Sequence, residues 1–197
     1  MNAWSDFFLS TGVVALAEIG DKTQLLAFFL SARFRRPWPI IWGILVATLA
    51  NHALAGAVGM GLAQWMGPDL LRWILGLGFI VMGAWMLIPD KLDQPAEGMG
   101  MGERLGVFGT TVVAFFLAEM GDKTQVATVA LAAQSASAYL VVLGTTLGMM
   151  IANVPAVLVG DRLADRLSPK WMHRIAAALF FCVGIFVLLG LSVDFLT

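Results

Sequence analysis

The chain has 197 residues and a formal net charge of −1; 59% of its residues are hydrophobic and only 13% are charged. A globular domain carries about 25% charged residues, so a compact soluble domain and a disordered chain are both excluded. The near-neutral charge provides no basic surface for nucleic acid, and the single cysteine, Cys182, excludes an intrachain disulfide framework. The composition is that of an all-α integral membrane protein.

Apolar stretches between charged residues predict six membrane-spanning helices, because one span needs about 20 mostly apolar residues. In chain order they are residues 7–32, 39–66, 73–88, 105–133, 138–160 and 175–193. The segment between the third and fourth spans is rich in proline, glycine and acidic residues, which indicates a polar linker. We therefore expect a first three-helix repeat over 1–88, a linker over 89–104, and a second three-helix repeat over 105–197.

The distribution of lysine and arginine predicts the orientation, because cytoplasmic connections carry most of the positive charge. Nine of these residues fall in the connections after the first, third and fifth spans, and only Arg72 falls on the opposite side. We expect a multi-pass protein of the cell (inner) membrane with the linker in the cytoplasm and both termini outside.

An eight-residue motif occurs twice in the chain, 101 residues apart. It reads AEIGDKTQ at 17–24 and AEMGDKTQ at 118–125. Because each half has three spans, an odd number, the second half must enter the membrane upside down relative to the first. Inverted repeats place a binding site near the bilayer midplane and are typical of secondary transporters.

Both motifs place acidic residues near the middle of a predicted span, where each charged, unpaired group costs about 2.5–3.5 kcal/mol. On a helix, the two acids of one motif lie on the same face. Oxygen ligands suit Mg²⁺, Ca²⁺ and Mn²⁺, and four acids against two lysines leave a formal charge of −2 that one divalent cation would balance. The predicted metal ligands are therefore Glu18, Asp21, Glu119 and Asp122.

An alternative for the same residues is that each glutamate only neutralises the lysine four positions later, which is a favourable spacing on a helix. We expect Lys22 and Lys123 to lie at the edge of the acidic site and to pair with carboxylates. The neighbouring hydroxyl and amide side chains point away from the acids in a regular helix. The motif glycines weaken the helix, so unwinding there could bring these oxygens to the site. These side chains are Thr23, Gln24, Thr124 and Gln125.

Three polar residues inside the second and fifth spans are harder to assign. Asn51 and Asn153 correspond in the two halves, and each is either an amide ligand or the donor of an interhelical hydrogen bond. His52 has no equivalent in the second half. We interpret it as a buried, hydrogen-bonded residue, with a proton relay as the alternative.

The two Glu-x-Gly-Asp-Lys-Thr segments resemble the E-x-G-D-[KR]-[ST] motif of the cation/proton exchangers that include human Golgi transmembrane protein 165 and the yeast Gdt proteins. The resemblance covers essentially the whole chain, which looks like a minimal bacterial form. It implies Ca²⁺/H⁺ or Mn²⁺/H⁺ exchange, and bacterial relatives are associated with manganese export. It implies transported Mn²⁺ or Ca²⁺ and no prosthetic group.

The predicted function is a secondary antiporter that exports Mn²⁺ and/or Ca²⁺ in exchange for protons, with the same carboxylates carrying metal and protons. Its expected partners are divalent cations, protons and the lipid bilayer, and nucleic acid is not among them. The sequence is also compatible with a homo-oligomer. Two other functional classes fit part of the sequence. A passive cation channel or a LysE-like exporter of small solutes would also fit the inverted repeat. An intramembrane aspartyl protease would use two aspartates, but it has no need of the additional acids and lysines.

Overall fold

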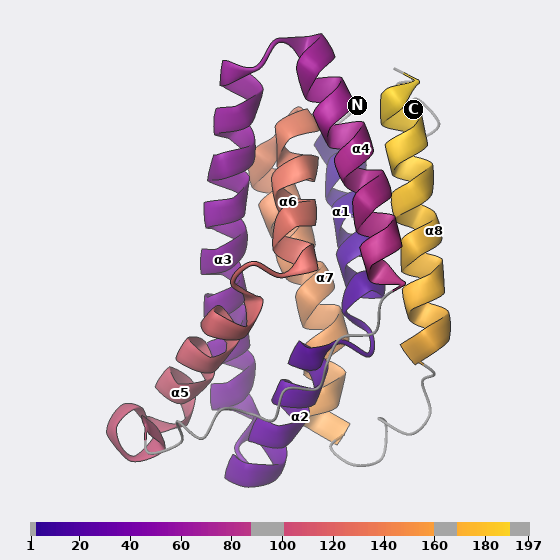
Figure 1. The fold of residues 1–197 in the computed structure, drawn as a ribbon. Coiled ribbons are helices and arrows are strands. Elements are labelled where there is room, and N and C mark those ends of the chain that lie inside the picture. Colours follow the sequence, from indigo (N-terminus) through magenta and orange to yellow (C-terminus); the bar gives the residue numbers. More distant parts are fainter. Residues whose placement is uncertain (1–2, 88–100, 160–168, 190–197) are drawn as a thin grey trace.

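The computed structural model describes residues 3–87, 101–159 and 169–189, and these residues form eight helices and no strand (Figure 1). The expectation of an all-α protein is confirmed. The helices are α1 (Ala3–Glu18), α2 (Lys22–Phe34), α3 (Pro37–Trp65), α4 (Pro68–Met86), α5 (Met101–Glu119), α6 (Lys123–Gln134), α7 (Ala138–Val159) and α8 (Pro169–Leu188).

The predicted linker 89–104 falls mostly outside the described residues. Its last part is helical, because α5 begins at Met101. Gly106 interrupts that helix with φ 66° and ψ 177°, so the first turn is separated from the rest of α5.

The helix lengths support fewer spans than the sequence predicted. Within the described residues, α3 (29 residues) and the segment Ala138–Leu158 of α7 (21 residues) are each long and apolar enough to cross a membrane. A third crossing results if Leu105–Glu119 and α6, bent by 73° at their junction, count as one span. The first predicted span is likewise divided into α1 and α2. The arrangement of six spans therefore stays a prediction.

Polar residues lie inside the helix bundle and large apolar residues lie on its surface. On α3, Thr48, Asn51 and His52 are at most 1% exposed, whereas Trp38 and Trp42 are more than half exposed. This distribution suits a hydrocarbon environment, in which polar side chains face the bundle interior.

The two halves of the chain interlock. Helix α3 of the first half packs against α5, α6 and α7, and α7 of the second half packs against α1 and α2. A Cβ atom at Gly148 of α7 would lie 2.6 Å from the carbonyl oxygen of Thr11 in α1, so this close approach requires glycine. Asp6, buried near the start of α1, accepts a hydrogen bond of 3.0 Å from the backbone N–H of Ala136, between α6 and α7. Each long helix thus supports the broken helix pair of the other half.

Candidate cation-binding site

Each motif breaks its helix in the same way. Helix α1 ends at Glu18 and α2 begins at Lys22, with Gly20 between them at φ 85°. In the second half, α5 ends at Glu119, α6 begins at Lys123, and Gly121 has φ 74°. Positive φ favours glycine because a Cβ atom is strained there. A regular helix through the motif is therefore wrong, and the alternative of local unwinding is confirmed.

The glutamines of the motif hold the two breaks in shape. The backbone N–H of Gly20 donates to Oε1 of Gln24 at 2.9 Å, and that of Gly121 donates to Oε1 of Gln125 at 2.7 Å. Gln24 also donates through Nε2 to the carbonyl oxygen of Ala152 in α7, at 3.0 Å. These amides support the turn and satisfy backbone groups that the helix break exposes.

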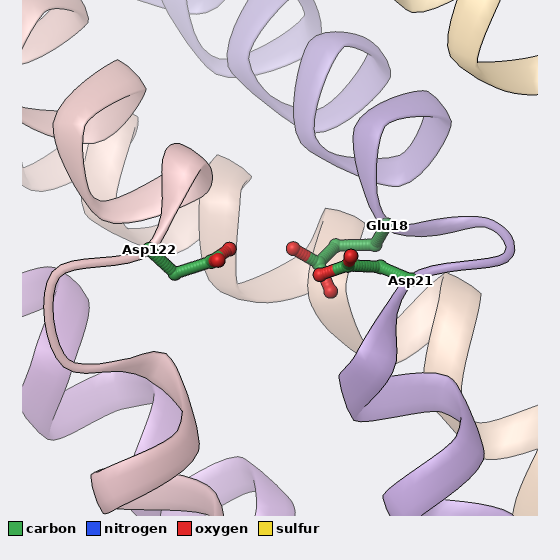
Figure 2. A group of neighbouring side chains, drawn as sticks. All are labelled: Glu18, Asp21 and Asp122. Atoms are coloured by element: carbon green, nitrogen blue, oxygen red, sulfur yellow. The ribbon is translucent and has the colours of Figure 1, made fainter. Parts of the chain in front are cut away.

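Three acids from the two motifs meet at the centre of the bundle. Each of Glu18, Asp21 and Asp122 contributes a carboxylate oxygen, and these three atoms lie within 4.8 Å of one another. Figure 2 shows Asp122 pointing across the gap toward Glu18 and Asp21. All three residues are at most 4% exposed. We call these three residues the acid cluster.

Glu119, the fourth predicted ligand, is not one of these three but lies close to them. It is 1% exposed, and the same hydroxyl oxygen, Oγ1 of Thr124, lies 3.2 Å from Oε2 of Glu119 and 3.4 Å from Oδ2 of Asp122. The structure therefore brings three of the four predicted ligands into one group and places the fourth beside it.

The motif threonines bind the glutamates rather than pointing away from them. Oγ1 of Thr23 donates to Oε2 of Glu18 at 2.6 Å, and Oγ1 of Thr124 lies 3.2 Å from Oε2 of Glu119. The other oxygen of each glutamate, Oε1, is buried and has no hydrogen-bond partner among the described residues. The hydroxyl thus orients one carboxylate oxygen and leaves the other available.

The two motif lysines occupy different surroundings. Nζ of Lys22 lies 2.9 Å from Oδ1 of Asp122, which confirms the expected ion pair but places its partner in the other motif. Lys123 is 2% exposed, and its Nζ lies 5.8 Å from the ring centre of Trp85 in α4. Trp85 was not among the predicted site residues. The available signal was the repeat: at the 101-residue offset of the two motifs, the position that corresponds to Trp85 is Phe186, which is also aromatic.

The asparagines of α3 and α7 use their amide nitrogens as donors. Asn51 donates to the carbonyl oxygen of Phe116 in α5 at 3.0 Å, and Asn153 donates to that of Met149, one turn earlier in its own helix, at 3.1 Å. Both Oδ1 atoms are buried without a hydrogen-bond partner among the described residues. The same holds for both ring nitrogens of His52, so this residue is buried as predicted but makes none of the expected hydrogen bonds there.

The buried acids of the two motifs need positive charge close to them. Carboxylates a few ångströms apart and away from water repel strongly when ionised, and a buried charge needs a counter-charge. Lys22 provides one positive charge. Four acids against the two motif lysines leave a formal charge of −2, which bound cations or protons can balance. The available donors are oxygens, as hard divalent cations prefer.

Comparisons with known proteins match both halves of the chain. The family described as "Divalent cation/proton antiporter GDT1" matches residues 6–94 and again residues 107–194. A protein of Vibrio cholerae named "Putative manganese exporter" is 49% identical over 178 residues, which cover 90% of this chain and 87% of the relative. A GDT1-like protein of Synechocystis sp. is 27% identical over 191 residues, covering 88% of this chain and 91% of the relative. GDT1-like protein 3 of Arabidopsis thaliana is 25% identical over 198 residues, covering 88% of this chain and 67% of the relative. No solved structure matches the chain.

Proposed function

This chain belongs to the GDT1 family of divalent cation/proton antiporters, and we propose that it exports Mn²⁺ from the cytoplasm in exchange for protons. Members of this family are integral membrane transporters and not enzymes, so the intramembrane protease is excluded. The choice of Mn²⁺ over Ca²⁺ is supported by the name of the Vibrio cholerae relative. The oxygen donors of the site are suitable for either ion.

The observation that carries the proposal is the convergence of carboxylates from both motifs. Glu18, Asp21 and Asp122 offer three oxygens within 4.8 Å of one another, and we propose that they bind the cation together with Glu119. The unpartnered Oδ1 atoms of the two interior asparagines are further candidates. The threonines and glutamines of the motif then act as supports, which orient the acids and hold the helix breaks.

Exchange follows from the sharing of these oxygens. When the cation leaves, the buried carboxylates lose its charge and protons take its place. A returning cation must displace those protons. The two ions therefore cross in opposite directions through one site, without needing to be bound at the same time.

The architecture proposed for this cycle has six spans. In it, α1 with α2 and α5 with α6 each form one broken span, and the three-helix units 1–88 and 105–197 are inverted repeats. The linker 89–104 lies on the cytoplasmic side of the cell (inner) membrane, and both termini lie on the opposite side. Broken helices at the midplane of inverted repeats are a common way to build an ion site with alternating access.

Proteoliposomes with an imposed pH gradient test the proposal. Wild-type protein should take up Mn²⁺ when the gradient is present, with Ca²⁺, Mg²⁺ and Zn²⁺ compared in parallel. Asp122→Asn should abolish this uptake. Asp69→Asn, which changes an exposed acid of α4, is the matched control and should transport normally. Mn²⁺ uptake that is the same with and without the pH gradient would contradict the proposal, and so would full uptake by Asp122→Asn.

A further inference from the structure

The ion pair between Lys22 and Asp122 involves one of the three acids of the acid cluster. Nζ of Lys22 lies 2.9 Å from Oδ1 of Asp122. Asp122 also supplies one of the three carboxylate oxygens that lie within 4.8 Å of one another. Both of its oxygens belong to one carboxylate, so a cation bound to either of them lies a few ångströms from the ammonium group. The lysine and a metal ion therefore interact with the same acid.

The position of Lys22 in its helix explains why it needs this acid. Helix α2 begins at Lys22, and its first turn holds no acidic residue. A positive side chain is unfavourable at the N-terminus of a helix, because the helix dipole places partial positive charge there. Asp122 comes from the other motif and offsets this charge at hydrogen-bonding distance. The negative charge of Asp122 thus holds the ammonium group in the site.

Lys22 can leave the site more easily than the acids can. Its side chain is 37% exposed, whereas that of Asp122 is 5% exposed. Glu18 is fully buried and accepts the hydrogen bond of 2.6 Å from Thr23. A lysine has a flexible four-carbon stem, so its ammonium group can withdraw while the backbone of α2 stays in place. The acids are therefore fixed ligands, and the lysine is a movable cation attached beside them.

Monovalent and divalent cations differ in what they gain by displacing this lysine. Na⁺ or K⁺ carries the same charge as the ammonium group, so replacing one by the other adds no attraction to the acids. The ammonium group also has the advantage of being attached to the protein, since an attached group competes at a high effective concentration. A divalent cation has twice the charge and is attracted more strongly by every carboxylate of the site. Displacement of the lysine therefore favours divalent cations.

We propose that Lys22 is a specificity-determining residue, a tethered cation that keeps monovalent cations out of the acid cluster and is displaced by divalent ones. The inference rests on the proposed cation site and adds a reason why that site selects divalent cations. Lys22 also limits the affinity for the metal, because its ion pair must be broken when the metal binds. Weaker binding in turn helps the ion to leave the site at the end of transport.

Lysine modification in wild-type protein tests the displacement. Purified protein in detergent is treated with an amine reagent in choline chloride, in sodium chloride of the same ionic strength, or in choline chloride with Mn²⁺. The modification of Lys22 is measured by mass spectrometry. Mn²⁺ should increase it severalfold, because the ammonium group no longer pairs with Asp122, and Na⁺ should leave it unchanged. Equal modification with and without Mn²⁺, or an equal increase with Na⁺, would overturn the proposal.

Two substitutions of Lys22 separate its charge from its size. The dissociation constant for Mn²⁺ is measured by calorimetry in the two salts at about pH 8, where few protons compete for the carboxylates. In choline chloride, Lys22→Met should bind Mn²⁺ about tenfold more tightly than wild type, which lies between the effects of an exposed ion pair and a buried charged hydrogen bond. Sodium chloride should weaken Mn²⁺ binding by this variant. In wild type and in Lys22→Arg, which keeps the charge, the two salts should give the same dissociation constant.

Arg72→Met is the matched control, because it removes the positive charge of an ion pair outside the site. Nη2 of Arg72 lies 3.6 Å from Oδ1 of Asp69 in α4. Its loss should change neither the dissociation constant for Mn²⁺ nor the effect of sodium. Melting temperatures of all variants show whether they are folded.

The outcomes separate this inference from the proposed function. If Lys22→Met binds Mn²⁺ no more tightly than wild type, or if sodium affects both proteins equally, the role of Lys22 is overturned. Mn²⁺ binding and exchange by wild-type protein would be unaffected by that result. Failure of wild-type protein to bind Mn²⁺ would instead contradict the cation site itself. If Lys22→Met does not fold, the modification of Lys22 in wild-type protein decides the question.

Discussion

The hydrogen bond from Thr23 to Glu18 makes a quantitative prediction about metal affinity. The bond is 2.6 Å long and both residues are fully buried, so water cannot replace the hydroxyl. Valine has the shape of threonine without the donor. A hydrogen bond to a charged group contributes about 1.5–3 kcal/mol. If the bond orients the carboxylate that binds the metal, Thr23→Val should weaken Mn²⁺ binding by about 10- to 150-fold.

Two other threonines serve as graded controls. The hydroxyl of Thr124 lies farther from its glutamate, at 3.2 Å, and is 3.4 Å from Asp122 as well, so Thr124→Val should weaken binding less. Thr128, also buried, donates to the backbone carbonyl of Thr124 and to no acid. Thr128→Val should therefore leave Mn²⁺ binding unchanged.

Calorimetric titration of the detergent-solubilised variants with Mn²⁺, together with their melting temperatures, measures both effects. The Mn²⁺ dissociation constant should be largest for Thr23→Val and smaller for Thr124→Val. It should be smallest, and equal, for Thr128→Val and wild type. If the three variants lose affinity in proportion to their loss of melting temperature, the hydroxyls serve only stability and the reasoning is refuted.

Three further substitutions test the helix break, the proton count and the packing of α1. Gly20→Ala places a Cβ atom at φ 85°, which should cost about 1–2 kcal/mol in thermal unfolding; Gly12→Ala, in open space within α1, should cost nothing. Glu119→Gln should reduce the protons released per bound Mn²⁺, measured by calorimetry in buffers of different ionisation enthalpy. Metal and protons compete for the same oxygens, so wild-type affinity should fall as the pH falls, and proton release unchanged by the substitution would exclude Glu119 as a carrier. Asp6→Ala removes the acceptor for Ala136 and should lower the unfolding free energy by about 1 kcal/mol; an unchanged melting temperature would contradict this.

Features that follow from short-range sequence patterns were predictable. The duplicated motif indicated that acids from both halves act at one place, and Glu18, Asp21 and Asp122 do converge. The glycines indicated where the helix could unwind, because their conformational preference is local. The ion pair of Lys22 was predictable as well, since an ammonium group in the middle of a predicted span needs a counter-charge.

Features that depend on tertiary packing were not predictable. Spacing along a helix suggested Glu18 as the partner of Lys22, but the break turns the lysine toward Asp122 in the other half. The contact of Lys123 with Trp85 depends on the packing of α4 against α6.

The interlocking of the halves has a consequence for biogenesis. During synthesis, α1 and α2 enter the membrane long before their packing partner α7 has been made. Until α7 arrives, the acids at the α1–α2 break lack the protein surroundings that bury them, and their exposure to hydrocarbon is costly. The nascent first half should therefore remain at the insertion machinery, or close to water, until the second half is complete. A chain truncated after residue 87 should be recognised as unassembled and degraded, which pulse-chase labelling of the truncated and full-length chains can measure.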